Sequence, residues 1–592
     1  MTEATQLRSL SLPRTNPTIA YQVAMPEPTN HLFEVTLVIK GWFSDRLDLK
    51  MPVWTPGSYL VREYARHLQD FSATGEQPLG WHKVSKNHWQ VDVLGVSDIT
   101  VRYRVFANEL TVRTNHLDST HGYFNPAALC FYLPGFEQCA IDIAILPPAN
   151  WQVTTPLPAI ENQPYTYRAA SFDVLVDSPF EIGQHQVYEF EAEGKPHEFA
   201  IWGRGNADVD RILADTRKII AVEAELFGEL PYDRYVFLLH LSSQGFGGLE
   251  HKNSCTLNYS RFGFQATEKY NRFMQLVAHE FFHLWNIKRI RPIALEAFDY
   301  DQENYTPSLW FSEGTTSYYD LTFPMRAGIY NAQTFLAAMS KEITRYLTTP
   351  GRLVQPLGES SFDAWIKLYR RDAHSDNSQI SYYLKGEMVT LLLDLIIRSR
   401  HSNQRSFDDV LRAMWQQFGK EETGFTPAQL QQTIETVAET DLSEFFDRYL
   451  NTTAELPLAD YLAWFGLQLQ GDEDLLPFTG MTVKSEGREI VKFVEFNSPA
   501  QQAGLDAGDE LLAIDGVRIT ADQLNDRLHD YQPGDVVEVT YFHQDELRTG
   551  AMRLAEPRST RYQLVPVANP TVDQQQNFQG WLGVTLSSIS AT

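Results

Sequence analysis

The segment Ala278–His283 constrains the fold of this chain more than any other, because it reads A-H-E-F-F-H inside an apolar stretch. Such a stretch predicts a helix, whose period of about 3.6 residues puts His279 and His283 one turn apart on the same face. Two imidazoles in that arrangement reach one metal ion, and Glu280 lies beside them as a base for water. The pattern is typical of zinc hydrolases, and the ordinary alternative is two histidines of a buried core.

A third ligand is needed, because a catalytic zinc site takes three protein ligands and leaves a fourth position to water. The apolar segment Leu309–Tyr319 predicts a second helix, and Glu313 is its only acidic residue. An acid in such a setting needs a partner or a metal ion to offset the cost of desolvation. Glu313 is therefore the best candidate, and a glutamate that caps or edges the helix is the alternative.

A glycine-rich segment, Ser243–His251, reads S-Q-G-F-G-G-L-E-H and precedes the first helix. Gly247 and Gly248 allow the backbone to approach an extended substrate closely. Glu250, at the end of this edge, is expected to bind a cationic group. A simple glycine-rich hairpin turn is the alternative.

A tyrosine pair opens another helical stretch, in the segment Ser381–Gly386 with the sequence S-Y-Y-L-K-G. A phenol at this place is able to donate a hydrogen bond to the oxyanion that forms when water attacks a carbonyl. For Tyr383 considered alone, ordinary core packing is the alternative.

Four of these motifs together resemble the glycyl aminopeptidase family of zinc metallopeptidases. They are H-E-F-F-H, the later Ser-Glu-Gly, the Gly-Gly-Leu-Glu-His edge and Tyr-x-Lys-Gly. The N-terminal block Val53–Arg66 looks like the same family, which belongs to the thermolysin-like superfamily with a glutamate as third zinc ligand. A PDZ-like segment near the C-terminus, Asn497–Gly516, also looks like this family.

The resemblance implies one Zn²⁺ per chain and a zinc aminopeptidase that releases small N-terminal residues such as Gly and Ala. Two alternatives stay open: a zinc endopeptidase with PDZ-guided substrates, and a peptide-binding scaffold without turnover. An inserted loop with Asp299, Asp301 and Glu303 is expected to reshape the substrate pocket. The implied roles are zinc ligation by His279, His283 and Glu313, general base catalysis by Glu280, transition-state donation by Tyr383, and anchoring of the substrate amine by Glu250.

The expected fold is multidomain α+β. Alternating apolar residues predict a β-sandwich-like domain over residues 1–200, and longer helical periods predict a mainly helical, thermolysin-like catalytic domain over 201–455. Residues 456–592 are expected to form a PDZ-like domain with a C-terminal extension. Its carboxylate-binding loop is placed at Ala463–Leu467, or otherwise at Gln579–Leu586. This domain is expected to bind a peptide tail or another subunit, or to be purely structural.

Composition narrows the partners and the compartment. A net charge of 49 − 75 = −26 argues against nucleic acid or an anionic membrane as partner and suits peptide substrates with a free amine. The three cysteines are too few for a disulfide framework. Met1–Arg8 lacks the features of a signal peptide, and no apolar run reaches the roughly 18 residues of a membrane span. A cytoplasmic protein is the expectation.

Overall fold

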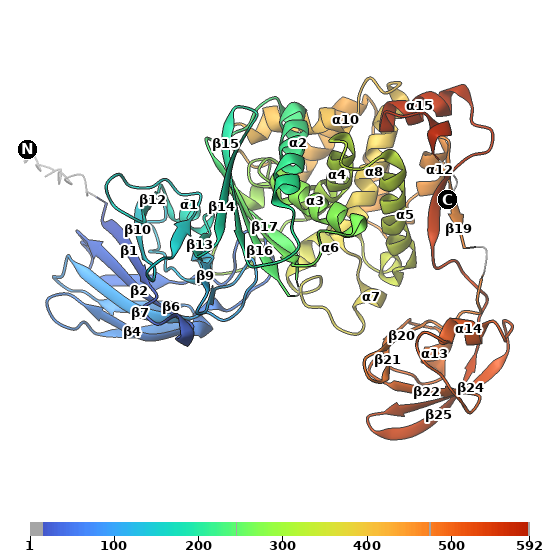
Figure 1. Cartoon of the computed structure of the whole chain (residues 1–592), viewed down its shortest axis with the longest axis horizontal. Coiled ribbons are helices and arrows are strands. Elements are labelled where there is room, and N and C mark those ends of the chain that lie inside the picture. The colour runs from blue at the N-terminus through green and yellow to red at the C-terminus, as the bar shows by residue number, and fades with distance from the viewer. Residues whose placement is uncertain (1–15, 244, 473–474, 590–592) are drawn as a thin grey trace, which may run out of the picture. The chain divides into compact units, whose positions relative to one another are not determined.

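The computed structural model describes residues 16–243, 245–472 and 475–589 (Figure 1). Met1–Arg8, where the sequence predicts no signal peptide, and Gln244 lie outside these residues. The chain divides into two compact units, of which the first contains the N-terminal residues up to Arg217 together with Leu230–Leu284 and Phe298–Asn304. Within the described residues, no helix has both the length and the apolar character needed to cross a membrane.

The N-terminal part of the first unit is rich in β-structure, as the alternating pattern predicts. Buried and exposed residues alternate along its strands, and the buried ones, such as Val35 and Val101, form one large core. The six-stranded sheet has the order β12 (Thr166–Ala169), β10 (Ile141–Leu146), β1 (Thr18–Ala24), β2 (Leu32–Lys40), β7 (Ile99–Phe106), β4 (Leu68–Thr74). Two smaller sheets are β3 (Arg46–Lys50), β6 (His88–Asp92), β5 (Trp81–Ser85), and β11 (Gln152–Thr154), β13 (Phe180–Gly183), β9 (His121–Phe124), β8 (His116–Leu117); helix α1 spans Phe172–Val176.

A five-stranded sheet carries the glycine-rich segment. Its order is β14 (Gln186–Ala192), β15 (Lys195–Trp202), β16 (Tyr235–Ser242), β18 (Ser254–Ser260), β17 (Phe246–Glu250). The glycine-rich strand β17 is therefore an edge strand, as predicted, and helix α3 (Thr267–Phe282) packs against β17 and β18. Helix α2 (Val209–Phe227) matches the helical period expected there. The domain boundaries at 200 and 455 stay predictions.

The second unit is mainly helical up to residue 463, which confirms the predicted change of period. The tyrosine pair lies at the start of α8, a helix that is buried along almost its whole length. The helices are α4 (Thr315–Arg326), α5 (Ala332–Thr348), α6 (Leu357–Phe362), α7 (Ser375–Ser378), α8 (Tyr382–Arg400), α9 (Phe407–Met414), α10 (Pro427–Ala438), α11 (Ser443–Leu450), α12 (Leu458–Ala463) and, after the PDZ-like part, α15 (Val572–Leu582).

The PDZ-like part has its own sheet and its own core. As predicted, a short helix precedes a buried strand that ends in an Asp-Gly turn, where Asp515 and Gly516 both have positive φ. The sheet order is β20 (Met481–Ser485), β21 (Glu489–Val494), β22 (Glu510–Ile514), β24 (Val536–His543), β25 (Glu546–Arg553), with β23 (Val517–Arg518) beside β22 and helices α13 (Pro499–Gln502) and α14 (Leu524–Leu528).

The predicted carboxylate-binding loop of this part is wrong. The segment Ala463–Leu467 joins α12 to β19 (Leu467–Gly471), and β19 pairs with β26 (Tyr562–Pro566) in a separate two-stranded sheet. Gln579–Leu586 belongs to α15 and the residues after it. Because neither segment borders an edge of the PDZ-like sheet in the hydrogen-bonding pattern, neither is placed to bind a peptide that extends that sheet.

Candidate active site

The first half of the candidate site is built on α3. The helix ends at Phe282, and His283 is its C-cap residue. The rings of His279 and His283 have centroids 4.6 Å apart and planes at 87°. Glu280 and His283 are buried, at 5% and 1% exposure. The one-turn spacing that the sequence predicts is therefore present, on the helix that packs beneath the edge strand.

The edge strand β17 approaches Glu280 as closely as a backbone can. A Cβ atom added to Gly248 would lie 2.2 Å from the carboxylate carbon of Glu280, so a larger residue here would displace the Glu280 side chain from its present position. At Gly247, by contrast, an added Cβ would have no atom within 4 Å. Arg113 donates from Nη2 to the carbonyl oxygen of Gly248 at 3.1 Å, which fixes the strand from the N-terminal β-domain. The segment is thus a positioned edge rather than only a hairpin turn.

Glu250 lies at the end of this edge and close to the helix. Single side-chain oxygens of Glu250 and Glu280 and a ring nitrogen of His283 all lie within 4.8 Å of one another. The N-terminal block packs against Glu250, because a Cβ on Gly57 would come 2.5 Å from its Oε1. Gly57 has a φ of +87°, which a side chain would strain as well. A carboxylate is therefore held next to the predicted base.

The acidic loop that the sequence expects at the substrate pocket docks on the N-terminal β-domain. Asp301 pairs with Lys50 and accepts hydrogen bonds from Asn87 and Tyr132, each at 2.8 Å. Trp54, from the N-terminal block, donates to the carbonyl oxygen of Asp299 at 2.8 Å. The structure thus gives Asp299 and Asp301 a role in anchoring the loop, and it shows Glu303 half-buried.

Glu313 lies in a turn of π-helix, Trp310–Gly314, that leads into α4. The segment is helical as predicted, but it begins as a π-turn, a form often found at functional sites. Asn286 holds this turn, because its Nδ2 donates to the carbonyl oxygens of Phe311 and Ser312, both at 3.1 Å. Glu313 itself is only 1% exposed. The hydrogen bonds from Asn286 thus fix the backbone on which the Glu313 side chain is carried.

The two glycines of the motifs Ser-Glu-Gly and Tyr-x-Lys-Gly touch each other. A Cβ on Gly314 would lie 2.5 Å from Cα of Gly386, and a Cβ on Gly386 would lie 2.7 Å from the carbonyl oxygen of Trp310. The π-turn and α8 therefore cross backbone against backbone. This contact brings Tyr383, one turn before Gly386, next to Glu313.

Tyr383, rather than its neighbour, has the environment expected of an oxyanion donor. Burial raises the pKa of Tyr383, and the negative charge of Glu313 raises it further. The phenol consequently stays protonated and able to donate. Its hydroxyl lies 3.3 Å from that of Tyr369. Tyr382 stacks on Tyr383 with centroids 4.8 Å apart and is fully buried.

One ligand atom from each of His279, His283 and Glu313 lies within 4.8 Å of the other two. Two imidazoles and one carboxylate are a donor set of catalytic zinc sites, so these side chains fit the metal that the sequence predicts. Within the first unit the structure brings His279 to His283 and Glu250 to Glu280, and within the second unit it brings Glu313 to Tyr383. The assignment of His279, His283 and Glu313 as one metal-ligand set stays a prediction.

Comparison with known families bears on the whole chain. Residues 20–184 match the Peptidase M61 N-terminal domain, residues 272–389 match the M61 glycyl aminopeptidase and residues 466–554 match a PDZ domain. An aminopeptidase N family protein from Idiomarina loihiensis is 33% identical, covering 95% of this chain and 100% of its own, with a TM-score of 0.90. The chain belongs to the M61 glycyl aminopeptidase family.

The matched ranges place the sites of this M61 chain in their family context. Residues 272–389 contain both histidines of α3, Glu313 and Tyr383, whereas Glu250 lies outside every matched range. A weaker similarity, with a TM-score of 0.47 and 12% identity over 75% of this chain and 95% of the other, is to the M1 zinc metallopeptidase of Deinococcus radiodurans. A search of curated proteins finds no match.

Three residues that support this M61 site escape an analysis of the sequence. Asn286 follows the end of α3 by four residues, and its spacing from the π-turn gives no signal in the sequence. Arg113 and Gly57 come from the N-terminal β-domain and meet β17 only through the tertiary fold. The dipeptide Pro56-Gly57, which is typical of turns, is the local sequence signal at this place, and Gly57 has a positive φ in the structure.

Proposed function

We propose that this M61 chain is a zinc aminopeptidase that hydrolyses the N-terminal peptide bond of peptides whose first residue is small. The observation that carries the proposal is the position of Glu250, whose carboxylate lies within 4.8 Å of Glu280 and His283. An α-ammonium group bound there would place the first peptide bond of the substrate, one residue away, next to Glu280. The name of the matched family, glycyl aminopeptidase, supports glycine as a first residue.

The proposed metal ligands are His279, His283 and Glu313. Their mutual distances and their donor types support this assignment. Bound Zn²⁺ supplies Lewis-acid chemistry and lowers the pKa of a coordinated water from about 15.7 to about 7. The burial of Glu313 and His283, each at 1% exposure, is consistent with a dry site in which such polarisation is strong.

The remaining roles follow from the chemistry of the side chains. Glu280 takes the proton of the attacking water and returns it to the leaving amine. Tyr383 donates its phenolic hydrogen to the developing oxyanion. Gly247, where the space beyond Cα is open, is proposed to border the substrate backbone, and Gly248 is proposed to let that backbone come close to Glu280.

The test compares glycyl p-nitroanilide with its N-acetylated form, using the native chain and Glu250→Gln. The native chain is expected to cleave only the free amine efficiently. A charge-assisted hydrogen bond contributes roughly 1.5–3 kcal/mol, so Glu250→Gln is expected to lower kcat/KM on the free amine by about 10- to 100-fold. Any residual cleavage of the acetylated substrate is expected to stay unchanged.

Glu225→Gln, on the exposed surface of α2, removes the same charge and is the matched control. Its kcat/KM is expected to equal that of the native chain. Efficient internal cleavage of acetylated peptides by the native chain would contradict the proposal and favour the endopeptidase. Equal losses on both substrates in Glu250→Gln would remove the amine-anchoring role of this residue.

A further inference from the structure

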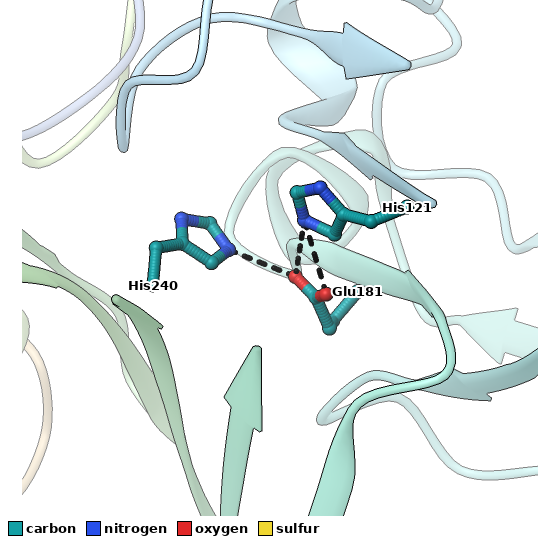
Figure 2. A group of neighbouring side chains, drawn as sticks. All are labelled: His121, Glu181 and His240. Atoms are coloured by element: carbon teal, nitrogen blue, oxygen red, sulfur yellow. Dashed lines mark hydrogen bonds and ion pairs between the residues drawn. The ribbon is translucent and has the colours of Figure 1, made fainter. Parts of the chain in front are cut away.

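A second group of side chains that could hold a metal ion lies in the first unit (Figure 2). It consists of His121 on β9, Glu181 on β13 and His240 on β16, which are 0%, 1% and 0% exposed. None of these residues belongs to a motif that the sequence reveals. The strands come from two different sheets, so the group joins the four-stranded sheet to the five-stranded one.

The donor atoms of the group converge. Nε2 of His240 lies 2.8 Å from Oε2 of Glu181, and Nε2 of His121 lies 3.1 Å from Oε1 and 3.3 Å from Oε2. One donor atom of each residue lies within 4.8 Å of the other two. Zinc ligands at about 2.0–2.2 Å in a tetrahedron are about 3.3–3.6 Å apart, and the distances from Glu181 to His240 and His121 lie within about 0.5 Å of that spacing.

A third imidazole stands next to this group. Nδ1 of His185 lies 3.8 Å from Oε1 of Glu181, and Nε2 of the same ring lies 2.8 Å from the hydroxyl of Thr154. A hydrogen bond from one ring nitrogen to a neighbouring acceptor is what normally orients a histidine that binds metal through the other. His185 is therefore the nearest candidate for the fourth donor of a closed tetrahedral site, although it lies outside the group of three whose donor atoms converge.

The hydrogen bonds of the group are incomplete without a cation. Oε1 of Glu181 and Nδ1 of His121, His185 and His240 are all buried without a hydrogen-bond partner. Most buried polar atoms in native proteins have a hydrogen-bond partner, so four atoms without one in a single group call for an explanation such as a bound ion. A coordinated metal ion engages two of these four atoms, Oε1 of Glu181 and Nδ1 of His185.

The charge of the group also suits a cation. Within the described residues, no lysine or arginine pairs with the carboxylate of Glu181, whose ion pairs are all with histidines.

The fold holds the group in place before any ion arrives. Glu181 pairs with Tyr123 in the β9–β13 ladder, and His240 pairs with Trp202 in the β15–β16 ladder. Trp202 stacks on the ring of His121 with centroids 4.1 Å apart. The ligands therefore sit on strands and against a rigid aromatic, which is the arrangement of a preorganised site.

We propose that His121, Glu181 and His240, with His185 as fourth ligand, bind a structural Zn²⁺ ion that is distinct from the proposed catalytic ion. Imidazole and carboxylate donors suit zinc, and four protein ligands close the site to substrate. The ion joins two sheets of the first unit and stabilises it against unfolding. It raises the zinc content from the one ion per chain that the sequence predicts to two.

The test measures zinc by mass spectrometry in the full-length chain after dialysis against metal-free buffer. The native chain is expected to hold about two ions, and His240→Gln, His121→Gln and Glu313→Gln about one each. His240→Gln combined with Glu313→Gln is expected to hold none. Because the two sites are emptied by different substitutions, failure of one proposal does not mimic failure of the other.

His197→Gln is the matched control for substitution of a buried histidine in the same unit. His197 is 1% exposed, and both of its ring nitrogens have partners, the carbonyl oxygen of Lys195 at 2.9 Å and the hydroxyl of Tyr232 at 2.8 Å. This variant is expected to keep the zinc content of the native chain. Circular dichroism checks that each variant is folded.

A folded His240→Gln with the zinc content of the native chain would overturn the proposal and leave a hydrogen-bonded network only. A second measurement needs no variant: diffraction at the zinc edge from crystals of the native chain. An anomalous peak between His121, Glu181 and His240 is expected. Its absence in crystals soaked with Zn²⁺ would overturn the proposal even if every variant were unfolded.

Discussion

Gly386→Ala tests whether the contact between the π-turn and α8 positions the candidate site. Alanine normally stabilises a helix interior relative to glycine by about 1 kcal/mol. Here the new Cβ would lie 2.7 Å from the carbonyl oxygen of Trp310, whereas ordinary contact begins at 3.4 Å, so the two backbones must separate by 3.4 − 2.7 = 0.7 Å. Overpacking of this kind costs about 1–3 kcal/mol, which outweighs the gain in propensity.

The same displacement separates Tyr383 from Glu313. A misplacement of about 1 Å can cost on the order of 100-fold in rate, so a shift of 0.7 Å is expected to lower kcat by roughly 10- to 100-fold. The assay is steady-state hydrolysis of glycyl p-nitroanilide, together with the thermal midpoint by circular dichroism. The expected result is a lower kcat, a lower midpoint and a KM that changes little.

Gly358→Ala is the matched control, because Gly358 lies in α6 and an added Cβ would meet its nearest atom, the carbonyl oxygen of Leu450, at 3.6 Å. This substitution is expected to raise the thermal midpoint slightly and to leave kcat unchanged. If Gly386→Ala behaved like Gly358→Ala, the glycine contact would have no part in positioning Tyr383, and the reasoning would be refuted.

Three more predictions concern the proposed base, the proposed oxyanion donor and a buried lysine. Glu280→Gln is expected to keep its zinc and lose turnover. Tyr383→Phe is expected to lower kcat about 10²-fold with little change in KM, whereas Tyr382→Phe is expected to keep a kcat near that of the native chain. A change in KM alone in Tyr383→Phe would exclude the oxyanion role. Burial lowers the pKa of Lys385 to about 8, so the free energy of unfolding is expected to rise by up to about 3 kcal/mol between pH 8 and 10.5, where only the unfolded chain keeps that proton. Lys385→Met is expected to flatten this rise in urea unfolding at several pH values, and an unchanged slope would contradict it.

The parts that the sequence predicts well are those set by local periodicity. The zinc helix, the edge strand with its two glycines and the helix after Tyr382 depend on residues within one or two turns of each other. A spacing of four residues in a helix fixes a shared face whatever the rest of the chain does. The π-turn at Glu313 is the exception, because Asn286 determines it from outside the segment.

The parts that the sequence does not reveal depend on the pairing of distant strands. His121 and His240 are brought together by the register of two sheets, and no spacing along the chain encodes that register. The error at Ala463–Leu467 has the same origin. The sequence of a strand after a glycine turn does not show which strand it pairs with. Here β19 pairs with β26 near the C-terminus and not with the PDZ-like sheet.

The N-terminal β-domain is part of the proposed amine-binding site and not only a neighbour of it. Gly57 packs on the carboxylate of Glu250, and Arg113 fixes the carbonyl oxygen of Gly248. The edge strand is thereby held at both the residue that approaches the base and the residue proposed to bind the amine. If Glu250 binds the substrate amine as proposed, selection of a free N-terminus depends on both the N-terminal β-domain and the catalytic part of the chain, because the residues proposed for hydrolysis, His279, Glu280 and His283 of the α3 motif with Glu313 and Tyr383, include no group that binds the amine.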